Sequence, residues 1–180
     1  MPTIGSAEEF FDVVDSNDDV VGRATRREVH ARGLLHRAVH ILVFNRAGEL
    51  FLQKRSQQKD TSPGAWDSSA SGHVDAGEDY DTCAVRELRE EIGLALDRPP
   101  ARWLRVPACA ETGSEFVWVY RGQSEGPFTL HPDEIETGAW YRPDEVARRL
   151  HEHPGGFASS FRLIWQRLAA RGDVPAGDFA

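Results

Sequence analysis

The stretch GHVDAGEDYDTCAVRELREEIGL, from Gly72 to Leu94, constrains this chain more than any other feature. It sets Glu87, Glu90 and Glu91 at spacings of three and four residues, which lie on one face of a helix. Like charges at these spacings destabilise a helix by roughly a few tenths of a kcal/mol per pair. Neighbouring arginines, bulk solvent or a bound cation would each relieve that repulsion, so the surrounding residues must decide among the three.

The same stretch predicts an amphipathic helix that packs on a sheet. At about 100° per residue, Val85, Leu88 and Ile92 fall on one stripe, which we expect to enter the core. The glutamates fall on a second stripe, beside the small side chains of Cys83 and Ala84, which leave room for a ligand. The helix therefore has one face for packing and another for chemistry.

Three clustered carboxylates with a backbone carbonyl nearby form an all-oxygen site of the kind that Mg²⁺ or Mn²⁺ prefers. Arg86 lies one turn before Glu90 and is expected to orient it, while Glu78 stands at the helix start, where an acid is favoured. For the RELREE run alone, a solvated helix face with Glu–Arg pairs is the commoner arrangement. The longer pattern around the run is needed to separate the two interpretations.

That longer pattern is Gly72, five residues, Glu78, seven residues, and then Arg86 to Leu94 reading REL-x-EE-x-GL. It matches the Nudix box at every defined position, and a chance match in a chain of this size is of order 10⁻⁷ from average residue usage. The chain therefore resembles the Nudix superfamily. The resemblance implies an α/β fold, an α/β/α sandwich around a mixed β-sheet.

The resemblance also implies roles for the box residues. Glu87, Glu90 and Glu91 would be ligands of Mg²⁺ or Mn²⁺, assisted by the carbonyl near Gly72. Such metals polarise phosphoryl oxygens and activate water for attack on a diphosphate. The catalytic set implied by the family pattern is Glu91, Glu134, Arg86 and Glu78.

A general base in this family often comes from a later loop, and HPDEIETGAW offers two glutamates for that role. Glu134 sits where such a base commonly falls, with Glu136 and Glu115 as alternatives. Acids in loops are also ordinary solvated residues, so the identity of the base stays open among the three.

The flanks from Gly33 to Glu78 resemble the branch that includes isopentenyl-diphosphate isomerase. In that branch a histidine and glutamate set binds a further metal, and Gly113 here replaces one expected acid. The residues at comparable places for this possible second metal site are His30, His36, His73 and Glu115. Those that match substrate-binding positions are Arg55, Lys59 and Phe161. Ordinary half-buried histidines and solubilising surface charges are the alternatives for these residues.

Two departures from the isomerases favour hydrolysis. The isomerases need a catalytic cysteine just before the box glycine, where this chain has Ser71, and a hydroxyl is a poor substitute for a thiol in proton chemistry at carbon. The isomerases also commonly degrade the box, which is intact here. We therefore expect a Mg²⁺- or Mn²⁺-dependent hydrolase that cleaves a nucleoside diphosphate derivative and releases a monophosphate. An isopentenyl-diphosphate isomerase and a non-catalytic nucleotide-binding domain are the alternatives.

The length of 180 residues and the pattern of elements predict one domain over residues 1–171, with an N-terminal hairpin and short helix in 1–35 and a disordered tail in 172–180. A net charge of −8 argues against nucleic acid as a partner. No apolar run reaches the roughly 20 residues of a membrane span, and Cys83 and Cys109 form no disulfide framework. We expect a cytoplasmic protein with a small-molecule diphosphate substrate, and a homodimer as the commonest assembly.

Overall fold

The computed structural model describes residues 8–176, and its centre is a seven-stranded mixed sheet. The strands are β3 (His36–Phe44), β4 (Leu50–Arg55), β5 (Trp66–Asp67), β6 (Ala70–His73), β7 (Ala101–Val106), β8 (Glu115–Gln123) and β9 (Ile135–Tyr141). The main path is β5-β4-β3-β8-β7, while β6 also pairs with β3 and β9 with β4. Among the strand pairs of this sheet that the structure describes, β3–β8 is parallel and the others are antiparallel. β3 pairs with three strands, β4, β6 and β8, and so forms the centre of the sheet.

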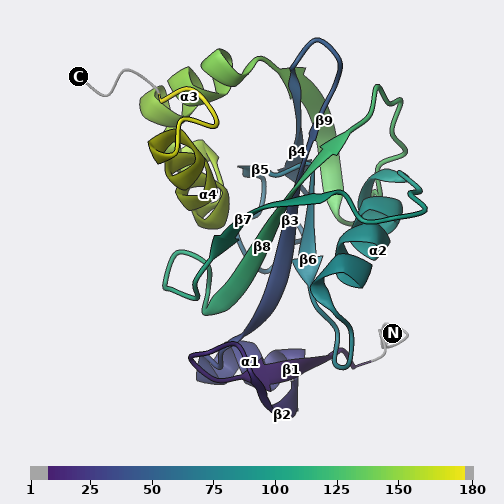
Figure 1. Ribbon diagram of the computed structural model, residues 1–180, viewed down its shortest axis with the longest axis vertical. Coiled ribbons are helices and arrows are strands. Elements are labelled where there is room, and N and C mark those ends of the chain that lie inside the picture. Colours follow the sequence, from purple (N-terminus) through teal and green to yellow (C-terminus); the bar gives the residue numbers. More distant parts are fainter. Residues whose placement is uncertain (1–7, 177–180) are drawn as a thin grey trace.

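Helices cover both faces of this sheet (Figure 1). Helix α2 (Tyr80–Ile92) lies on one face, and α3 (Pro143–Glu152), a short 3₁₀ turn (Pro154–Gly156) and α4 (Ser159–Ala170) lie on the other. Residues of β3 alternate between the two layers, as the twofold side-chain period of a strand requires. Ile41 packs in the core beneath α2, whereas Leu42 packs in the core beneath α3 and α4. The predicted α/β/α sandwich around a mixed sheet is confirmed.

The buried face of α2 differs from the predicted stripe. Leu88 and Ile92 are fully buried as expected, but Val85 is only half-buried, and Cys83 and Ala84 are fully buried. The reason is that Glu87 and Glu91 also face the sheet, which turns the buried arc towards Cys83 and leaves Val85 at its margin. The small residues thus serve close packing against the sheet instead of leaving room for a ligand.

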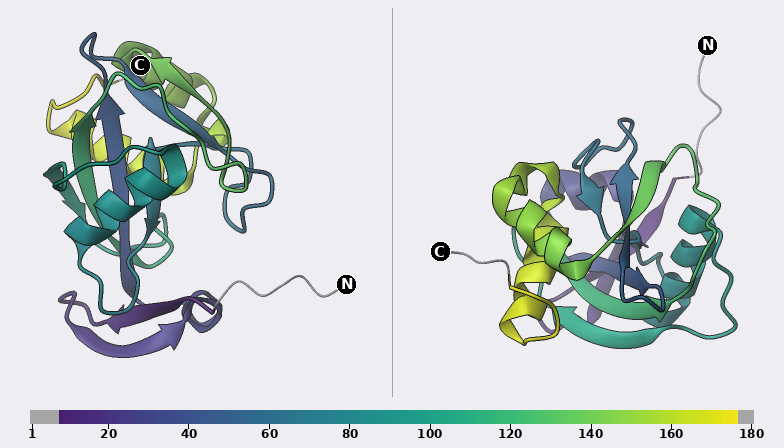
Figure 2. Two further views of the ribbon diagram at one scale, coloured as in Figure 1. Left: turned by 90° about the vertical axis from the view of Figure 1, so that its right-hand side faces the viewer. Right: turned by 90° about the horizontal axis from the view of Figure 1, so that it is seen from above.

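A separate N-terminal unit lies at the end of the sheet where β3 begins (Figure 2). It consists of the hairpin β1 (Phe10–Val14) and β2 (Val20–Thr25) and the helix α1 (Arg26–Arg32), at the positions that the sequence predicts. Thr25 and Glu28 form a capping box at the start of α1, and Gly33 ends the helix with a φ of 60°. The hairpin turn is joined to the rest of the protein because Asp18 accepts hydrogen bonds from Arg37 and Tyr80.

The chain that follows α4 still packs against it. Val174 is buried in the core under α4, and the Trp165 indole N–H donates to the carbonyl of Pro175 at 3.2 Å. Packing therefore continues into residues 172–176, the first part of the predicted disordered tail 172–180, whereas residues 177–180 lie outside the described residues. Across the described part of the chain, no helix has the length and apolar character to cross a membrane.

Candidate functional site

The three glutamates of the box occupy different environments on α2. Glu87 and Glu91 are buried, with exposed fractions of 8% and 5%, whereas the side chain of Glu90 is 56% exposed. Gly72 on β6 lies directly against Glu87, because a Cβ at Gly72 would be 2.0 Å from Glu87 Oε1. The two buried carboxylates thus face the sheet edge at β6, and Glu90 borders them from the solvent side.

Arg86 connects most of the charged groups in this part of the box. Its guanidinium binds both oxygens of Glu78 at 2.9 Å and donates to Glu87 Oε1 at 2.9 Å and Glu90 Oε2 at 3.2 Å. It also donates to the carbonyl of His73 at 3.1 Å. The bidentate bond to Glu78 is the main reason that the pKa of Arg86 is raised. Arg86 and Glu78, the two residues expected to support the box, thus lie in one network, and their supporting roles stay a prediction.

Glu91 is held from the sheet by two donors. The backbone N–H of Ser71 at 3.0 Å and the side-chain amide of Gln53 at 2.8 Å both donate to Glu91 Oε2. Burial raises the pKa of Glu91 to about 7, although the two hydrogen bonds act in the opposite direction. Sequence reasoning missed Gln53, for which the only signal is a polar residue within the otherwise apolar start of β4, LFLQ.

The pKa of Glu87 is also raised, by burial first and by the charge of Glu91 second. Two adjacent buried carboxylates are costly when both are ionised, unless a cation lies between or beside them. Arg86 compensates Glu87 in part, but Glu91 has only neutral hydrogen-bond donors. The arrangement therefore suits a divalent cation bound by carboxylate oxygens.

Glu134 and Glu136, two candidates for the general base, are placed differently, because Glu134 precedes β9 and Glu136 lies on that strand. Glu134 forms an ion pair with Lys59, and the charges of both residues act on the pKa of Glu91. Glu136 instead pairs with Lys54 at 3.1 Å on the exposed edge of the sheet. The structure thus brings Glu134 and Lys59 next to α2, the acidic helix that carries Glu91.

Glu115, the third candidate base, belongs to a second cluster at the start of β3. Its members are His30 on α1, His36 on β3, His73 on β6 and Glu115 on β8. Each residue offers one ligand atom, and the four atoms all lie within 4.8 Å of one another. The structure therefore assembles the set predicted as a possible second metal site.

The buried His36 ring has the orientation of a ligand. Its Nδ1 lies 2.8 Å from the carbonyl of Leu34, which requires the proton on Nδ1 and leaves Nε2 with a lone pair. Nε2 is buried and makes no hydrogen bond within residues 8–176, although Glu115 Oε1 is 3.4 Å away. An unpartnered buried nitrogen is costly, so this atom points to a missing partner such as a metal ion.

Charges within the cluster affect one another strongly. Burial alone would raise the pKa of Glu115, but the charge of His73, 2.9 Å away, holds it well below its ordinary value. Burial lowers the pKa of His30, and His73 and His36 lower it further. Phe11 of the hairpin stacks on His73 with ring centroids 4.6 Å apart, which fixes the ring that contacts Glu115 at 2.9 Å.

The other residues predicted to bind substrate are less open. The Arg55 side chain is 11% exposed and donates to Asp67 at 3.1 Å and to the carbonyl of Thr61 at 3.0 Å. Phe161 is fully buried in the core beneath α4, where it stacks on Phe157. Of the three predicted residues, Lys59 is therefore the one that the structure places beside the acidic helix.

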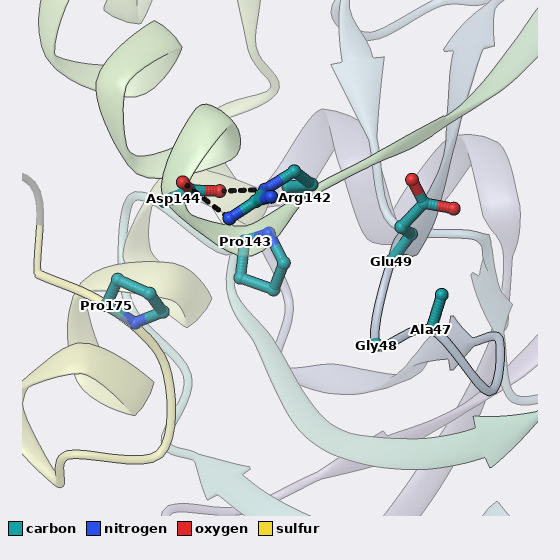
Figure 3. A pocket seen from close by; sticks show the side chains of 7 residues that line it. All are labelled: Ala47, Gly48, Glu49, Arg142, Pro143, Asp144 and Pro175. Atoms are coloured by element: carbon teal, nitrogen blue, oxygen red, sulfur yellow. Dashed lines mark hydrogen bonds and ion pairs between the residues drawn. The ribbon is translucent and has the colours of Figure 1, made fainter.

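Surface depressions among the described residues include one beside α2 and one beside α3. One of about 660 Å³ adjoins the exposed side of α2 and is bordered by Arg86, Glu90 and Arg98. The other, of about 560 Å³, lies between the β3–β4 turn and the start of α3, where Arg142 pairs with Asp144 (Figure 3). No predicted site residue lines the second depression, so only the first adjoins the chemistry considered above.

Comparisons with known proteins agree with this architecture. The family model described as the NUDIX domain matches residues 34–161. An uncharacterized Nudix hydrolase of Pseudomonas aeruginosa is 39% identical over 152 residues, which cover 81% of this chain and 87% of that protein. An isopentenyl-diphosphate Delta-isomerase of Pectobacterium atrosepticum is 31% identical over 159 residues, covering 87% of this chain and 89% of that protein.

A solved structure gives the same result at the level of the fold. A crystal structure from Deinococcus radiodurans superimposes with a TM-score of 0.77 and 29% sequence identity, covering 88% of this chain and 98% of that one. Residues 34–161, which match the family model, contain the entire box and all the sheet strands from β3 to β9. The chain therefore belongs to the Nudix hydrolase family.

Proposed function

We propose that this protein is a Mg²⁺- or Mn²⁺-dependent hydrolase that cleaves the diphosphate linkage of a nucleoside diphosphate derivative and releases a monophosphate. One observation carries the proposal: Glu87 and Glu91 are buried side by side with raised pKa values, beside a glycine backbone that admits no side chain. A binding domain without catalytic metal has no need for this costly pair. A cation that neutralises both carboxylates explains it.

The residues of the box fit such a cation. Glu87, Glu90 and Glu91 supply carboxylate oxygens, and the backbone of Gly72 lies close enough to contribute its carbonyl. A divalent cation supplies Lewis-acid polarisation of phosphoryl oxygens and lowers the pKa of bound water. Arg86 fixes the orientation of Glu87 and Glu90 from one side, and Glu78 fixes Arg86 from the other.

Glu134 is the general base in this proposal. It is paired with Lys59, and both lie close enough to Glu91 to shift its pKa. A substrate diphosphate would attract the Lys59 ammonium, which would free the carboxylate of Glu134 to accept a proton from water. Glu136 and Glu115 are the less suitable candidates, since the first pairs with Lys54 and the second lies within the histidine cluster.

The histidine cluster would hold a second metal ion. The unpartnered Nε2 of His36 supports this assignment, and two further histidines with one carboxylate form a ligand set typical of transition metals. The substrate would be a small diphosphate compound, with no nucleic-acid or membrane partner.

A substrate screen tests the main proposal. The purified protein is incubated with nucleoside diphosphate and triphosphate derivatives and with Mg²⁺ or Mn²⁺, and phosphate-containing products are identified by mass spectrometry. We expect metal-dependent release of a monophosphate, and at least a hundredfold loss of that activity in Glu91→Gln. Glu152→Gln, which changes an exposed acid at the end of α3, is the matched control and should keep full activity.

Turnover without added metal after chelation, or equal activity in the wild type and Glu91→Gln, would contradict the proposal. Metal-independent nucleotide binding without any turnover would favour the non-catalytic alternative.

Isopentenyl-diphosphate isomerisation is the second candidate, favoured by the complete histidine cluster. Ser71 stands against it, because its hydroxyl lacks the acidity of a thiol. Isopentenyl diphosphate therefore belongs in the same screen, and formation of the allylic isomer would support this candidate over hydrolysis.

A further inference from the structure

Gln53 is a buried polar side chain in the middle of the sheet, and the proposed function gives it no role. It lies on β4, is 1% exposed and pairs across the sheet with Asp67 of β5 and Gly138 of β9. Its neighbours Leu52 and Lys54 point to the other face, because strand side chains alternate. The Gln53 side chain therefore points towards α2 from beneath.

Its amide nitrogen donates to Glu91 Oε2 at 2.8 Å. The same nitrogen lies 3.4 Å from the carbonyl of Ser69, a second acceptor on the same side. With two acceptors facing this atom, the amide must present its NH₂ group and not its oxygen. Gln53 is thus a fixed donor to the carboxylate.

The backbone N–H of Ser71 donates to the same oxygen of Glu91 at 3.0 Å. Both donors engage Oε2, and no hydrogen bond within the described residues reaches Oε1. The carboxylate is therefore anchored by one oxygen, while the other remains available for a ligand. Ser71 supplies its contact through the backbone, so Gln53 is the side chain that controls this anchoring.

We propose that Gln53 is a positioning residue that orients Glu91 so that Oε1 faces the divalent cation. This inference rests on the proposed function, because it assumes that Glu91 is a metal ligand. Hydrogen-bond partners that orient a metal ligand typically contribute about 10-fold to 100-fold to metal affinity. Gln53 acts through Glu91 and touches neither metal nor substrate, so its loss should weaken metal binding before it affects substrate binding.

Direct titration with Mn²⁺ tests the inference, with free Mn²⁺ followed by its paramagnetic resonance signal. Gln53→Met keeps nearly the same volume but removes the donor, and Gln53→Leu serves as a second variant if the first folds poorly. We expect Mn²⁺ affinity to fall about 10-fold to 100-fold in either variant. Raising the Mn²⁺ concentration should restore much of kcat, with the substrate KM unchanged.

Ser69→Ala is the matched control. Ser69 is fully buried in the neighbouring segment, accepts from the backbone of Val43 and donates to the carbonyl of Phe51. Its loss should lower the unfolding temperature without changing Mn²⁺ affinity by more than about twofold, because the substitution keeps the backbone carbonyl that faces Gln53 and, within the described residues, the hydroxyl bonds only to the backbone. A fall in Mn²⁺ affinity equal to that of Gln53→Met would mean that general destabilisation explains both, and would overturn the inference.

A double-mutant cycle separates this inference from the proposed function. In the Glu91→Gln background, Gln53→Met should cause no further loss of Mn²⁺ affinity, because the group that it orients is gone. Fully additive losses, or equal affinity in the wild type and in Gln53→Met, would overturn the role of Gln53 while leaving the metal site intact. If the wild type itself binds no Mn²⁺, the metal site of the proposed function is wrong and the inference is refuted with it.

Discussion

The carboxylate of Glu87 occupies the space that a side chain at Gly72 would need. A Cβ at this position would lie 2.0 Å from Glu87 Oε1 and 2.7 Å from Oε2, far inside van der Waals contact. The φ of Gly72 lies outside the positive region that favours glycine, so close approach and not backbone conformation explains this residue. The absence of a side chain at Gly72 is therefore what allows the carboxylate of Glu87 to occupy its position.

Gly72→Ala should accordingly displace Glu87 and weaken metal binding. We expect an activity loss of at least tenfold with a Mn²⁺ requirement shifted to higher concentration, because the ligand must move away from its orienting bond to Arg86. Gly155→Ala is the control, since a Cβ at Gly155 meets nothing within 4 Å. Wild-type activity in Gly72→Ala would show that the contact has no role in the site.

Glu134→Gln should lower kcat by about 100-fold to 10,000-fold, the usual contribution of a general base. The substitution keeps the shape of the side chain and removes its ability to accept the proton from water. Glu136→Gln is the matched control. This exposed glutamate lies only two residues after Glu134 but pairs with Lys54, so its variant should retain near-normal kcat. The measurement is steady-state kcat of both variants. A larger loss of kcat in Glu136→Gln than in Glu134→Gln would reassign the base to Glu136.

The histidine cluster should bind a transition metal in the absence of substrate. We expect Co²⁺ to give visible absorption bands in the wild type and to lose them in His36→Gln, since His36 Nε2 is a buried lone pair without a partner. His153→Ala changes an exposed histidine near α3 and should leave the spectrum unchanged. Identical spectra in the wild type and His36→Gln would exclude His36 as a ligand.

His40, a buried residue of β3, should make the stability of the protein depend on pH. Burial lowers its pKa below the ordinary value of 6.5, although the charge of Asp67 opposes the shift. As the pH falls below about 6.5, the unfolded chain takes up a proton at this position that the folded protein resists, so the free energy of unfolding decreases. Urea unfolding at pH 5.5 and pH 7.5 should show a smaller loss in His40→Gln than in the wild type. A loss of the same size in both would show that His40 does not contribute.

The acidic helix could be predicted because its information lies in one continuous stretch. The spacing of Glu87, Glu90 and Glu91 gave their helical face directly, and the one-turn spacing of Arg86 and Glu90 gave one of the ion pairs of Arg86. The four members of the histidine cluster were found through the flanking resemblance, and the structure does bring their ligand atoms together. Local patterns and family motifs were thus sufficient to identify the residues of both candidate sites, the glutamates of α2 and the histidine cluster.

Contacts that depend on strand register were out of reach. Gln53 meets Glu91 only because β4 places its side chain under α2, and nothing within LFLQKR reveals that neighbour. The buried arc of α2 was misjudged at Val85 because the helical wheel cannot show that two ionisable side chains face the sheet. Phe161 was expected near the substrate, but in α4 it packs with Phe157 and Trp165 in the core.

The two-part origin of the histidine cluster has a consequence for how such a protein can change. His36, His73 and Glu115 come from the segment that matches the family model, whereas His30 comes from α1, which precedes it. The hairpin and α1 thus form a module that would complete the ligand set of the proposed second metal site. Substitutions confined to that module would then add or remove one proposed ligand, His30, while helix α2, on which hydrolysis is proposed to depend, keeps its sequence unaltered.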